Sequence, residues 1–398
     1  MSLLDRRTFL KSAGAAAMLP AAGGLASRAR GATAMTITPF DITVSGAQIT
    51  DLRERLAMTR WPSEVAATWE RGTPVAFVRS LAEEWATAYD WKATVARLRR
   101  LPHFVTEIDG QPIHFVHVKS AAADAEPLLL IHGWPGSFME FEGVVETLSQ
   151  AFDLVIPSIP GFGFSGPVRD EGWSTIRAGK AFAELMTRLG YDRFGVHGGD
   201  TGSLVARAMA LDVPERIMGA HVLQFFSFPS GDPAEFERLG PDDHRRVAAL
   251  ETFGQRDSYN VVMGKRPQSI AFALADSPVG QLTWMLELYA AFGDFPHQLT
   301  RQQILDHATL YWTTGTMGSS ANIYFETGRS GAWEETRPTT IPMGVAVFPN
   351  DFLSIRVFAE RDHHNIVHWS EMARGGHFAA LEVPELLAAD IAKFFGGL

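Results

Sequence analysis

The sequence predicts an α/β protein organised around a buried, mainly parallel β-sheet. Short apolar runs at residues 127–131, 154–156 and 343–347 fit the buried strands of such a sheet. A further strand-like stretch begins at Arg193 and passes through a glycine-rich turn into residues 204–210, where apolar side chains have helical spacing. The length of 398 residues and a hydrophobic content of 46% allow one large α/β domain with an insertion, or two domains.

Charge and cysteine content narrow the classes of function. The formal net charge is -10 and the chain has no long basic run, which argues against nucleic acid or an anionic membrane surface as a partner. Because the chain has no cysteine, disulfides, thiol nucleophiles and cysteine-bound zinc are excluded. The composition leaves the oligomeric state, including a homo-oligomer, open.

The N-terminus resembles a bacterial twin-arginine export signal. Arg6 and Arg7 precede a mild apolar run at residues 13–19, and small residues lead to an Ala-x-Ala pattern that predicts cleavage after Ala34. The apolar run is too short and too weak to span a bilayer. We therefore expect a periplasmic or secreted protein with no stable membrane span.

Residues 35–118 form an N-terminal segment that does not follow a repeated βα pattern. We expect a helix over residues 51–57, with Thr50 as its cap. A second helix is expected over residues 75–89, where a Thr-Pro pair supplies a cap and then Pro74 as the first helical residue.

The same segment ends in a predicted hairpin over residues 104–118, because Asp109 and Gly110 form a turn signal between two alternating strands. Tryptophans recur along the segment, and we interpret them as core residues that pack it against its neighbour. They are Trp61, Trp69, Trp85 and Trp91.

The turn at residues 198–202, Gly-Gly-Asp-Thr-Gly, has the pattern of a nucleophile elbow. In such a turn the central side chain stands above the sheet edge, near the positive end of the following helix. The central residue here is Asp200, and a carboxylate nucleophile suits displacement at an sp3 carbon, as in opening an epoxide or displacing a halide. The turn alone is equally compatible with an Asp200 that only caps the helix.

A second glycine-rich loop, residues 132–136, follows the apolar run that ends at Ile131. Glycines at the carboxyl end of a parallel strand leave backbone N–H groups pointed into the crevice where α/β sheets bind ligands, so we expect an oxyanion hole here. A Pro/Gly-rich loop at residues 157–166 is typical of a pocket mouth. No serine lies in a Gly-x-Ser-x-Gly pattern, which argues against a serine esterase.

Together these motifs resemble those of the microsomal-type epoxide hydrolases. The likeness runs from about residue 38 to the C-terminus and rests on four places in the chain. These are Trp85 with residues 90–91 and 108–110, the loop at 132–136, the turn at 198–203, and the stretch at 374–380. The resemblance implies an α/β-hydrolase fold with an inserted helical cap and an N-terminal meandering segment.

The resemblance also implies which groups react. Asp200 would be the nucleophile and His377 the base, with Asp351 as the acidic partner of that histidine. Their order along the chain agrees with the order in this fold. From the residues alone, Asp351 also fits the N-cap of the next helix, and His377 fits a loop histidine that only bonds backbone.

By the same resemblance, two tyrosines of the cap would hold the epoxide oxygen. These match Tyr259 and Tyr324, and Tyr289 and Tyr311 remain alternatives.

The oxyanion hole would be formed by the backbone N–H groups of Trp134 and Thr201. Position 201 departs from the family, which commonly has tryptophan there. The departure changes the expected pocket wall and substrate shape.

The expected activity is therefore the hydrolysis of a small apolar epoxide to a vicinal diol through an ester on Asp200, with no cofactor and no metal. A haloalkane dehalogenase is an alternative, although Thr201 argues against it, since halide-binding donors often include a tryptophan beside the nucleophile. A non-catalytic hydrolase-fold binding protein is another. The histidines at 363, 364 and 368 have spacing compatible with metal ligands, but we interpret them as a structural or solvated cluster.

The predicted domain organisation follows from these assignments. It comprises the export signal at 1–34, the N-terminal segment at 35–118, a first part of the hydrolase core at 119–224, the helical cap at 225–334 and the second part of the core at 335–398.

Overall fold

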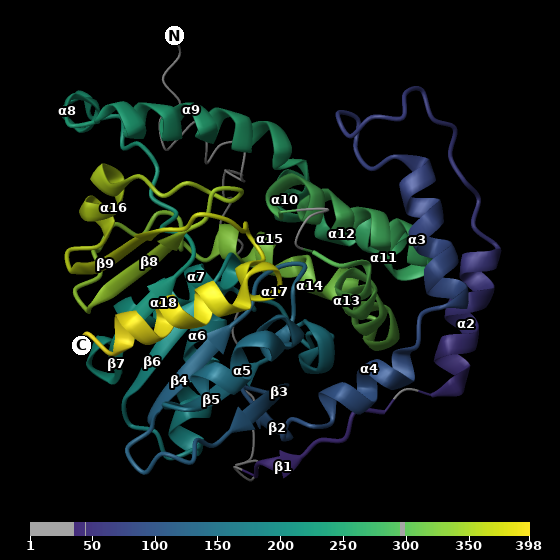
Figure 1. The fold of residues 1–398 in the computed structure, drawn as a ribbon, viewed down its shortest axis with the longest axis horizontal. Helices are drawn as coiled ribbons and strands as arrows, with labels where there is room; N and C mark the ends of the chain where they lie inside the picture. Colours follow the sequence, from purple (N-terminus) through teal and green to yellow (C-terminus); the bar gives the residue numbers. More distant parts are fainter. Residues whose placement is uncertain (1–35, 44, 295–298) are drawn as a thin grey trace, which may run out of the picture.

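The computed structural model describes residues 36–43, 45–294 and 299–398. Within these ranges the chain forms one sheet with helices packed around it and a further group of helices beside it (Figure 1). The predicted export signal and its cleavage site lie outside the described residues. None of the described helices combines the length and the apolar character needed to cross a bilayer.

The described part of the chain contains a nine-stranded sheet with the order β1-β2-β3-β5-β4-β6-β7-β8-β9. Neighbouring strands run parallel from β5 to β9, and β1, β2 and β3 extend the β5 side in antiparallel fashion. The strands are β1 (Thr38–Pro39), β2 (His103–Ile108), β3 (Gln111–Val118), β4 (Glu126–Ile131), β5 (Phe152–Pro157), β6 (Phe194–Gly198), β7 (Ile217–Val222), β8 (Met343–Val347) and β9 (Ile366–Glu371). The three predicted apolar strands are confirmed as β4, β5 and β8.

The N-terminal helices are α2 (Gly46–Ala57), α3 (Val75–Thr87) and α4 (Trp91–Leu98). The predicted start of the first helix was wrong, because Ser45 and Gln48 form a reciprocal capping box that begins the helix before Thr50.

The start of α3 also differs from the prediction. Pro74 is extended and lies just outside the helix, as its N-cap. The first helical N–H, that of Val75, instead donates to the carboxylate of Glu64 at 2.7 Å, a contact that helix-capping rules do not anticipate.

The predicted hairpin is confirmed, with β2 and β3 antiparallel and both turn residues, Asp109 and Gly110, at positive φ.

Of the four tryptophans predicted to be core, Trp85 and Trp91 are buried, whereas Trp69 is 44% exposed. The ring of this tryptophan lies against the partly buried Phe77, at 5.4 Å between centroids. Its stretch of chain contains no helix or strand that would press it into the core.

The helices around the sheet cover both of its faces. The pair α5 and α18 pack side by side, as do α6 and α7 (Figure 1). These elements are α5 (Glu142–Leu148), α6 (Thr175–Arg188), α7 (Thr201–Asp212), α16 (Arg356–Asp362), α17 (Ala379–Glu382) and α18 (Pro384–Phe395), with short 3-10 turns η1 (Phe138–Phe141), η2 (Gly163–Ser165) and η3 (Pro214–Arg216).

A group of helices is inserted between β7 and β8 and lies beside the strand ends (Figure 1). They are α8 (Pro233–Glu237), α9 (Pro241–Arg256), α10 (Ser258–Lys265), α11 (Pro267–Asp276), α12 (Pro278–Phe292), α13 (Arg301–Thr314), α14 (Met317–Ser320) and α15 (Asn322–Arg329). All of them fall within the predicted cap at 225–334, whose boundaries stay a prediction.

The N-terminal segment is tied to this cap through α13. Asp306 of α13 accepts hydrogen bonds from Tyr89 at 2.6 Å and from Arg97 at 2.7 Å. Trp85 donates its indole N–H to Thr309 at 2.8 Å. The segment therefore braces the helices that cover the strand ends.

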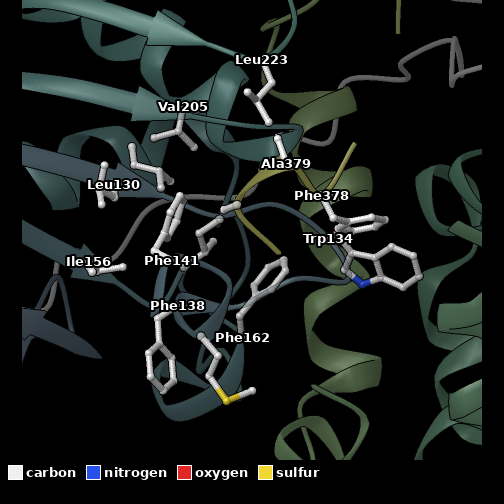
Figure 2. Close-up of a cluster of buried hydrophobic side chains, with 14 of the residues drawn as sticks. Leu130, Trp134, Phe138, Phe141, Ile156, Phe162, Val205, Leu223, Phe378 and Ala379 are labelled. Carbon is white, nitrogen blue, oxygen red and sulfur yellow. The ribbon is translucent and has the colours of Figure 1, made fainter. Parts of the chain in front are cut away.

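Large side chains from the sheet, its helices and its loops form one continuous core (Figure 2). Leu130 of β4 and Ile156 of β5 are buried in it together with Val205 of α7. Trp134, in the loop after β4, is also buried in this core. The loop that the sequence predicted as an oxyanion hole is therefore fixed by packing.

Candidate active site

Asp200 stands on the sharp turn between β6 and α7. Its backbone has φ 53° and ψ -121°, a combination rare for a residue with a side chain. A Cβ atom at Gly202 would lie 2.1 Å from the carbonyl oxygen of Ile131, so only glycine lets the turn approach β4 this closely. Asp200 occupies the N-cap position, but its side chain makes no capping hydrogen bond.

The carboxylate of Asp200 points instead into the site. Its Oδ1 accepts the backbone N–H of Trp134 at 2.9 Å and the side-chain hydroxyl of Thr201 at 2.8 Å. Its Oδ2 faces Nε2 of His377 at 3.7 Å. The three predicted residues therefore meet at one carboxylate, although the hydrogen bond from position 201 comes from the hydroxyl group.

His377 is held between two carboxylates. Its Nδ1 lies 2.7 Å from Oδ1 of Asp351, which has an exposed side-chain fraction of 1%. The backbone N–H of His377 donates to the carbonyl oxygen of Phe292, which fixes the loop. The next helix after Asp351, α16, begins only at Arg356, so Asp351 is not its N-cap.

The charges around His377 set its protonation state. Burial alone would lower the pKa of this imidazole, but the charge and hydrogen bond of Asp351, followed by the charge of Asp200, raise it to about 9. At neutral pH the ring is therefore protonated and carries a positive charge between the side chains of Asp200 and Asp351.

Both predicted tyrosines line a cavity of about 780 Å³ together with Asp200 and His377. The hydroxyl of Tyr324 is buried and has no hydrogen-bond partner among the described residues. Burial, followed by the charge of Asp200, raises the pKa of both Tyr259 and Tyr324 well above the usual range, so both keep their protons as donors.

The indole of Trp134 positions the two tyrosines. It stacks on the ring of Tyr259 at 5.8 Å and meets the ring of Tyr324 edge-on at 6.0 Å. The alternatives, Tyr289 and Tyr311, do not line this cavity. Tyr311 donates instead to the carbonyl oxygen of Gly136.

The rest of the cavity wall is mainly apolar and aromatic. It contains Leu204, Phe226, Phe228, Phe253, Ile323, Trp333 and Phe352. Such a lining with a few convergent polar groups is typical of a site for a small apolar molecule.

Sequence reasoning missed Gln224, which joins the two halves of the site. Its Oε1 accepts the backbone N–H of Asp200 at 2.7 Å, and its Nε2 donates to Oδ2 of Asp351. The residue lies just beyond the end of β7. The rule that functional groups collect at the carboxyl ends of parallel strands would have marked the position, although not the residue's role.

Glu140 was also missed. It lies with Asp200 and His377 on a second cavity, of about 330 Å³. Burial raises the pKa of Glu140 to about 8; the nearby His377 acts against this shift and Asp200 adds to it. Glu140 is therefore neutral at pH 7. An acidic residue in the 3-10 turn after the oxyanion loop gave no sequence signal for this burial.

The predicted histidine cluster is divided in the structure. His363 bonds a threonine hydroxyl and His364 is exposed. His368 instead joins His221 and Asp390, with ligand atoms within 4.8 Å of one another. The nitrogens of both histidines already hydrogen-bond the carboxylate of Asp390, at 2.9 and 3.0 Å, which fits a structural network.

The sequence matches two protein families. Residues 37–141 match the family described as epoxide hydrolase N terminus, and residues 126–315 match the α/β hydrolase fold. Epoxide hydrolase 1 of Sus scrofa is 32% identical, over 94% of this chain and 91% of its own length. The chain belongs to the microsomal-type epoxide hydrolases. This membership makes it an epoxide hydrolase by enzyme class and confirms the resemblance seen in its motifs.

Solved structures of the family agree with the fold. The juvenile hormone epoxide hydrolase of the silkworm Bombyx mori superposes with a TM-score of 0.85 at 28% identity, covering 92% of this chain and 95% of that chain. The epoxide hydrolase of Aspergillus niger gives 0.82 at 29% identity, with 91% and 96% covered. The predicted α/β-hydrolase fold with a helical cap and an N-terminal segment is confirmed.

Proposed function

We propose that the protein hydrolyses small apolar epoxides to vicinal diols through a covalent ester on Asp200. The observation that carries this proposal is the position of the Asp200 carboxylate. One oxygen is held by Trp134 and Thr201, and the other faces His377 and a cavity lined by two tyrosine side chains. This arrangement supplies a nucleophile, a base and acid donors around one apolar space.

In the first step, Oδ2 of Asp200 attacks a ring carbon of the epoxide. The carbon–oxygen bond of the ring breaks and its electron pair goes to the epoxide oxygen, which takes a proton from Tyr259 or Tyr324. Both tyrosines hold their protons at working pH, and the hydroxyl of Tyr324 has no competing acceptor among the described residues. The product of this step is a hydroxyalkyl ester.

Before the second step, the proton that His377 carries in the resting enzyme passes to the tyrosinate left by the first step, which restores the tyrosine and leaves the imidazole neutral. His377 then removes a proton from water, whose oxygen attacks the ester carbonyl of Asp200. Negative charge develops on Oδ1, where Trp134 donates its N–H. Collapse of the tetrahedral intermediate breaks the bond between Cγ and Oδ2, and the leaving diol oxygen receives the proton held by His377. The carboxylic acid that hydrolysis leaves on Asp200 then gives its proton to His377, which restores the resting enzyme.

Ester formation itself converts His377 into a base. In the resting enzyme the Asp200 charge contributes to the raised pKa of about 9. The ester is neutral, so that contribution disappears and the pKa of His377 falls. Asp351 keeps its hydrogen bond to Nδ1 and holds the ring in its orientation. The same histidine is thus protonated before alkylation and able to accept a proton afterwards.

Haloalkane dehalogenation is the second candidate that shares an aspartate elbow, and two observations disfavour it. The indole N–H of Trp134 donates to Ser320 at 3.0 Å and is not free to bind a halide. The residue beside the nucleophile is a threonine whose hydroxyl donates to Asp200. This alternative is tested by measuring chloride release from a panel of haloalkanes, which a dehalogenase would produce.

The test is a single turnover of styrene oxide in water labelled with heavy oxygen, followed by mass spectrometry of the peptide that contains Asp200. We expect diol formation and one heavy oxygen in Asp200 of the wild-type enzyme. Asp200→Asn is the matched control and should form neither ester nor diol. Diol formation with no label in Asp200 would show direct attack by water and overturn the ester mechanism.

We also propose that residues 1–34 direct export by the twin-arginine route. The support is the paired Arg6 and Arg7, the mild apolar run and the Ala-x-Ala pattern. Expression in a bacterium that has this route should give periplasmic protein beginning at Met35. The double variant Arg6→Lys/Arg7→Lys should stay in the cytoplasm at full length; equal export of both proteins would contradict the proposal.

A further inference from the structure

We propose that the side-chain hydroxyl of Thr201 is a catalytic donor of the oxyanion hole and acts on the hydrolysis of the ester. This inference rests on the proposed function, because it assigns a role within the second step. It concerns the side chain of Thr201, whereas the sequence predicted a role for the backbone N–H of this residue.

The two oxygens of Asp200 have different surroundings. Oδ1 accepts two hydrogen bonds, from the N–H of Trp134 at 2.9 Å and from Oγ1 of Thr201 at 2.8 Å. Oδ2 faces His377 at 3.7 Å, beyond hydrogen-bond distance. The less engaged Oδ2 is the oxygen that attacks the epoxide. Oδ1 then becomes the carbonyl oxygen of the ester, with both donors already in place.

The position of Thr201 suits this role. It is the first residue of α7, where the helix dipole favours negative charge, and only 5% of it is exposed. Trp134, on the other side of the carboxylate, is completely buried. Because water has little access to either donor, the hydrogen bonds act in a low-dielectric environment and need no reorganisation when charge appears.

The hydroxyl affects the two steps in opposite directions. In the resting carboxylate, Oδ1 carries part of one negative charge. That charge decreases when the ester forms, and then increases to a full charge in the tetrahedral intermediate. Hydrogen bonds to an ionised acceptor are about twice as strong as those between neutral groups. The Thr201 hydroxyl therefore stabilises the transition state for ester hydrolysis, whereas it slightly opposes alkylation.

The experiment separates these two steps in the full-length enzyme. Styrene oxide is mixed with excess enzyme, and intact-protein mass spectrometry follows the ester as it forms and decays. Thr201→Val keeps the shape of the side chain and removes the hydroxyl, whereas Thr201→Ser keeps the hydroxyl. Thr187→Val on α6 is the matched control, since its hydroxyl only bonds the carbonyl oxygen of Ala183 in its own helix.

We expect Thr201→Val to form the ester at least as fast as the wild type and to hydrolyse it about 10- to 100-fold more slowly, which approaches the loss of about 10²–10³ measured for single oxyanion donors elsewhere. Thr201→Ser should recover most of the hydrolysis rate, and Thr187→Val should match the wild type. Should Thr201→Val fail to fold, Thr201→Ala replaces it with the same expectation.

Two results would overturn the inference. One is ester hydrolysis at the wild-type rate in the Val variant, or in the Ala variant. The other is an equal slowing of both steps, which a purely structural role would produce. Failure of the underlying mechanism is distinguishable from both, because the wild type would then show diol without any ester on Asp200.

Discussion

The pairs His377–Asp351 and His221–Asp390 each join a buried histidine to an aspartate, and only the first is arranged for the proposed catalysis. In the active site, Nδ1 of His377 lies 2.7 Å from Asp351. At the side of the sheet that α18 covers, Nε2 of His221 lies 2.9 Å from Asp390. Both histidines are buried, and both pairs form close hydrogen bonds. The pair by itself therefore does not define a base.

The difference lies in what the second nitrogen meets. Nε2 of His377 faces a second carboxylate, Asp200, and the two border the same cavity. Nδ1 of His221 instead meets Nδ1 of His197 at 2.9 Å. The carboxylate of Asp390 is shared further with His368 at 3.0 Å. The active site thus has two carboxylates around one histidine. The second site has one carboxylate that is hydrogen-bonded by two histidines.

The pKa values follow this balance of charge. Burial by itself acts to lower the pKa of both His377 and His221. Around His377 two aspartates outweigh that effect and raise the pKa to about 9. Around His221 burial outweighs the attraction of Asp390, and the pKa stays below its ordinary value. The count of nearby charges and access to a cavity, rather than the residue types, decide which histidine can take part in proton transfer.

The largest expected effect is the difference in ester hydrolysis rate between variants that lack the imidazole of His377 and of His221. His377→Gln should form the Asp200 ester and hydrolyse it about 10²- to 10⁴-fold more slowly, because the general base is lost. His221→Gln is the matched variant and should hydrolyse the ester at nearly the wild-type rate. Single-turnover mass spectrometry with styrene oxide measures both rates. Equal losses in the two variants would mean that the distinction drawn between the pairs does not hold.

Removing the carboxylate of the second pair should affect stability and not catalysis. Asp390→Asn leaves a buried imidazole donor without its ionised acceptor, at a cost of about 1–3 kcal/mol for each group left unsatisfied. Urea unfolding should show the lower stability, with kcat/KM unchanged at low temperature. Asp276→Asn, which breaks an exposed pair with Arg55, is the control and should cost less than about 1 kcal/mol. A urea unfolding midpoint of Asp390→Asn equal to that of the wild type would contradict a structural role for Asp390.

The pKa of His377 should differ between the free enzyme, in which Asp200 is a carboxylate, and the intermediate, in which Asp200 is an ester. With Asp200 ionised, the pKa of His377 is about 9. Once the ester removes that charge the pKa must fall, so ester decay should rise with pH and level off at an apparent pKa below the free-enzyme value. NMR titration of the free enzyme and single-turnover decay between pH 5 and 10 give the two values. An apparent pKa in the ester at or above the free value is incompatible with this mechanism.

A pH-dependent effect on stability is expected from Glu140, the buried acid that borders a cavity with Asp200. Its pKa rises from 4.5 to about 8 because of burial, so the folded protein holds this proton when the unfolded chain has released it. Stability from this group is therefore lost as pH rises from about 4.5 to 8. Glu140→Gln cannot titrate, so it should become progressively more stable than the wild type across that window.

Thermal unfolding at pH 5, 7 and 9 measures this difference. Glu385→Gln, at an exposed position paired with Arg374, provides the control and should not gain stability with pH in the same way. A Glu140→Gln variant whose stability relative to wild type does not change with pH would show that Glu140 is ionised in the folded state.

The sequence predicted those parts of the molecule whose geometry is set by residues adjacent in the chain. The elbow at Asp200 was recognisable because the strand, the small residues and the helix that produce it are contiguous. The hairpin turn at Asp109 was recognisable for the same reason. The start of α2 was missed although it is also local, because the reciprocal contacts of Ser45 and Gln48 lie before the apolar pattern on which the prediction relied.

The motifs of the chain also identified the residues that meet at the reacting carboxylate, through their resemblance to a family. Only the tertiary structure showed which oxygen of Asp200 each of them contacts. It likewise showed that Gln224 joins the nucleophile to Asp351, and that Glu140 is buried beside them. These contacts join segments far apart in the sequence, and the charges and burial that they create exist only once the sheet has brought those segments together. The sequence by itself therefore predicted the groups that are proposed to react, and the fold decided their hydrogen-bond partners and the charges around them.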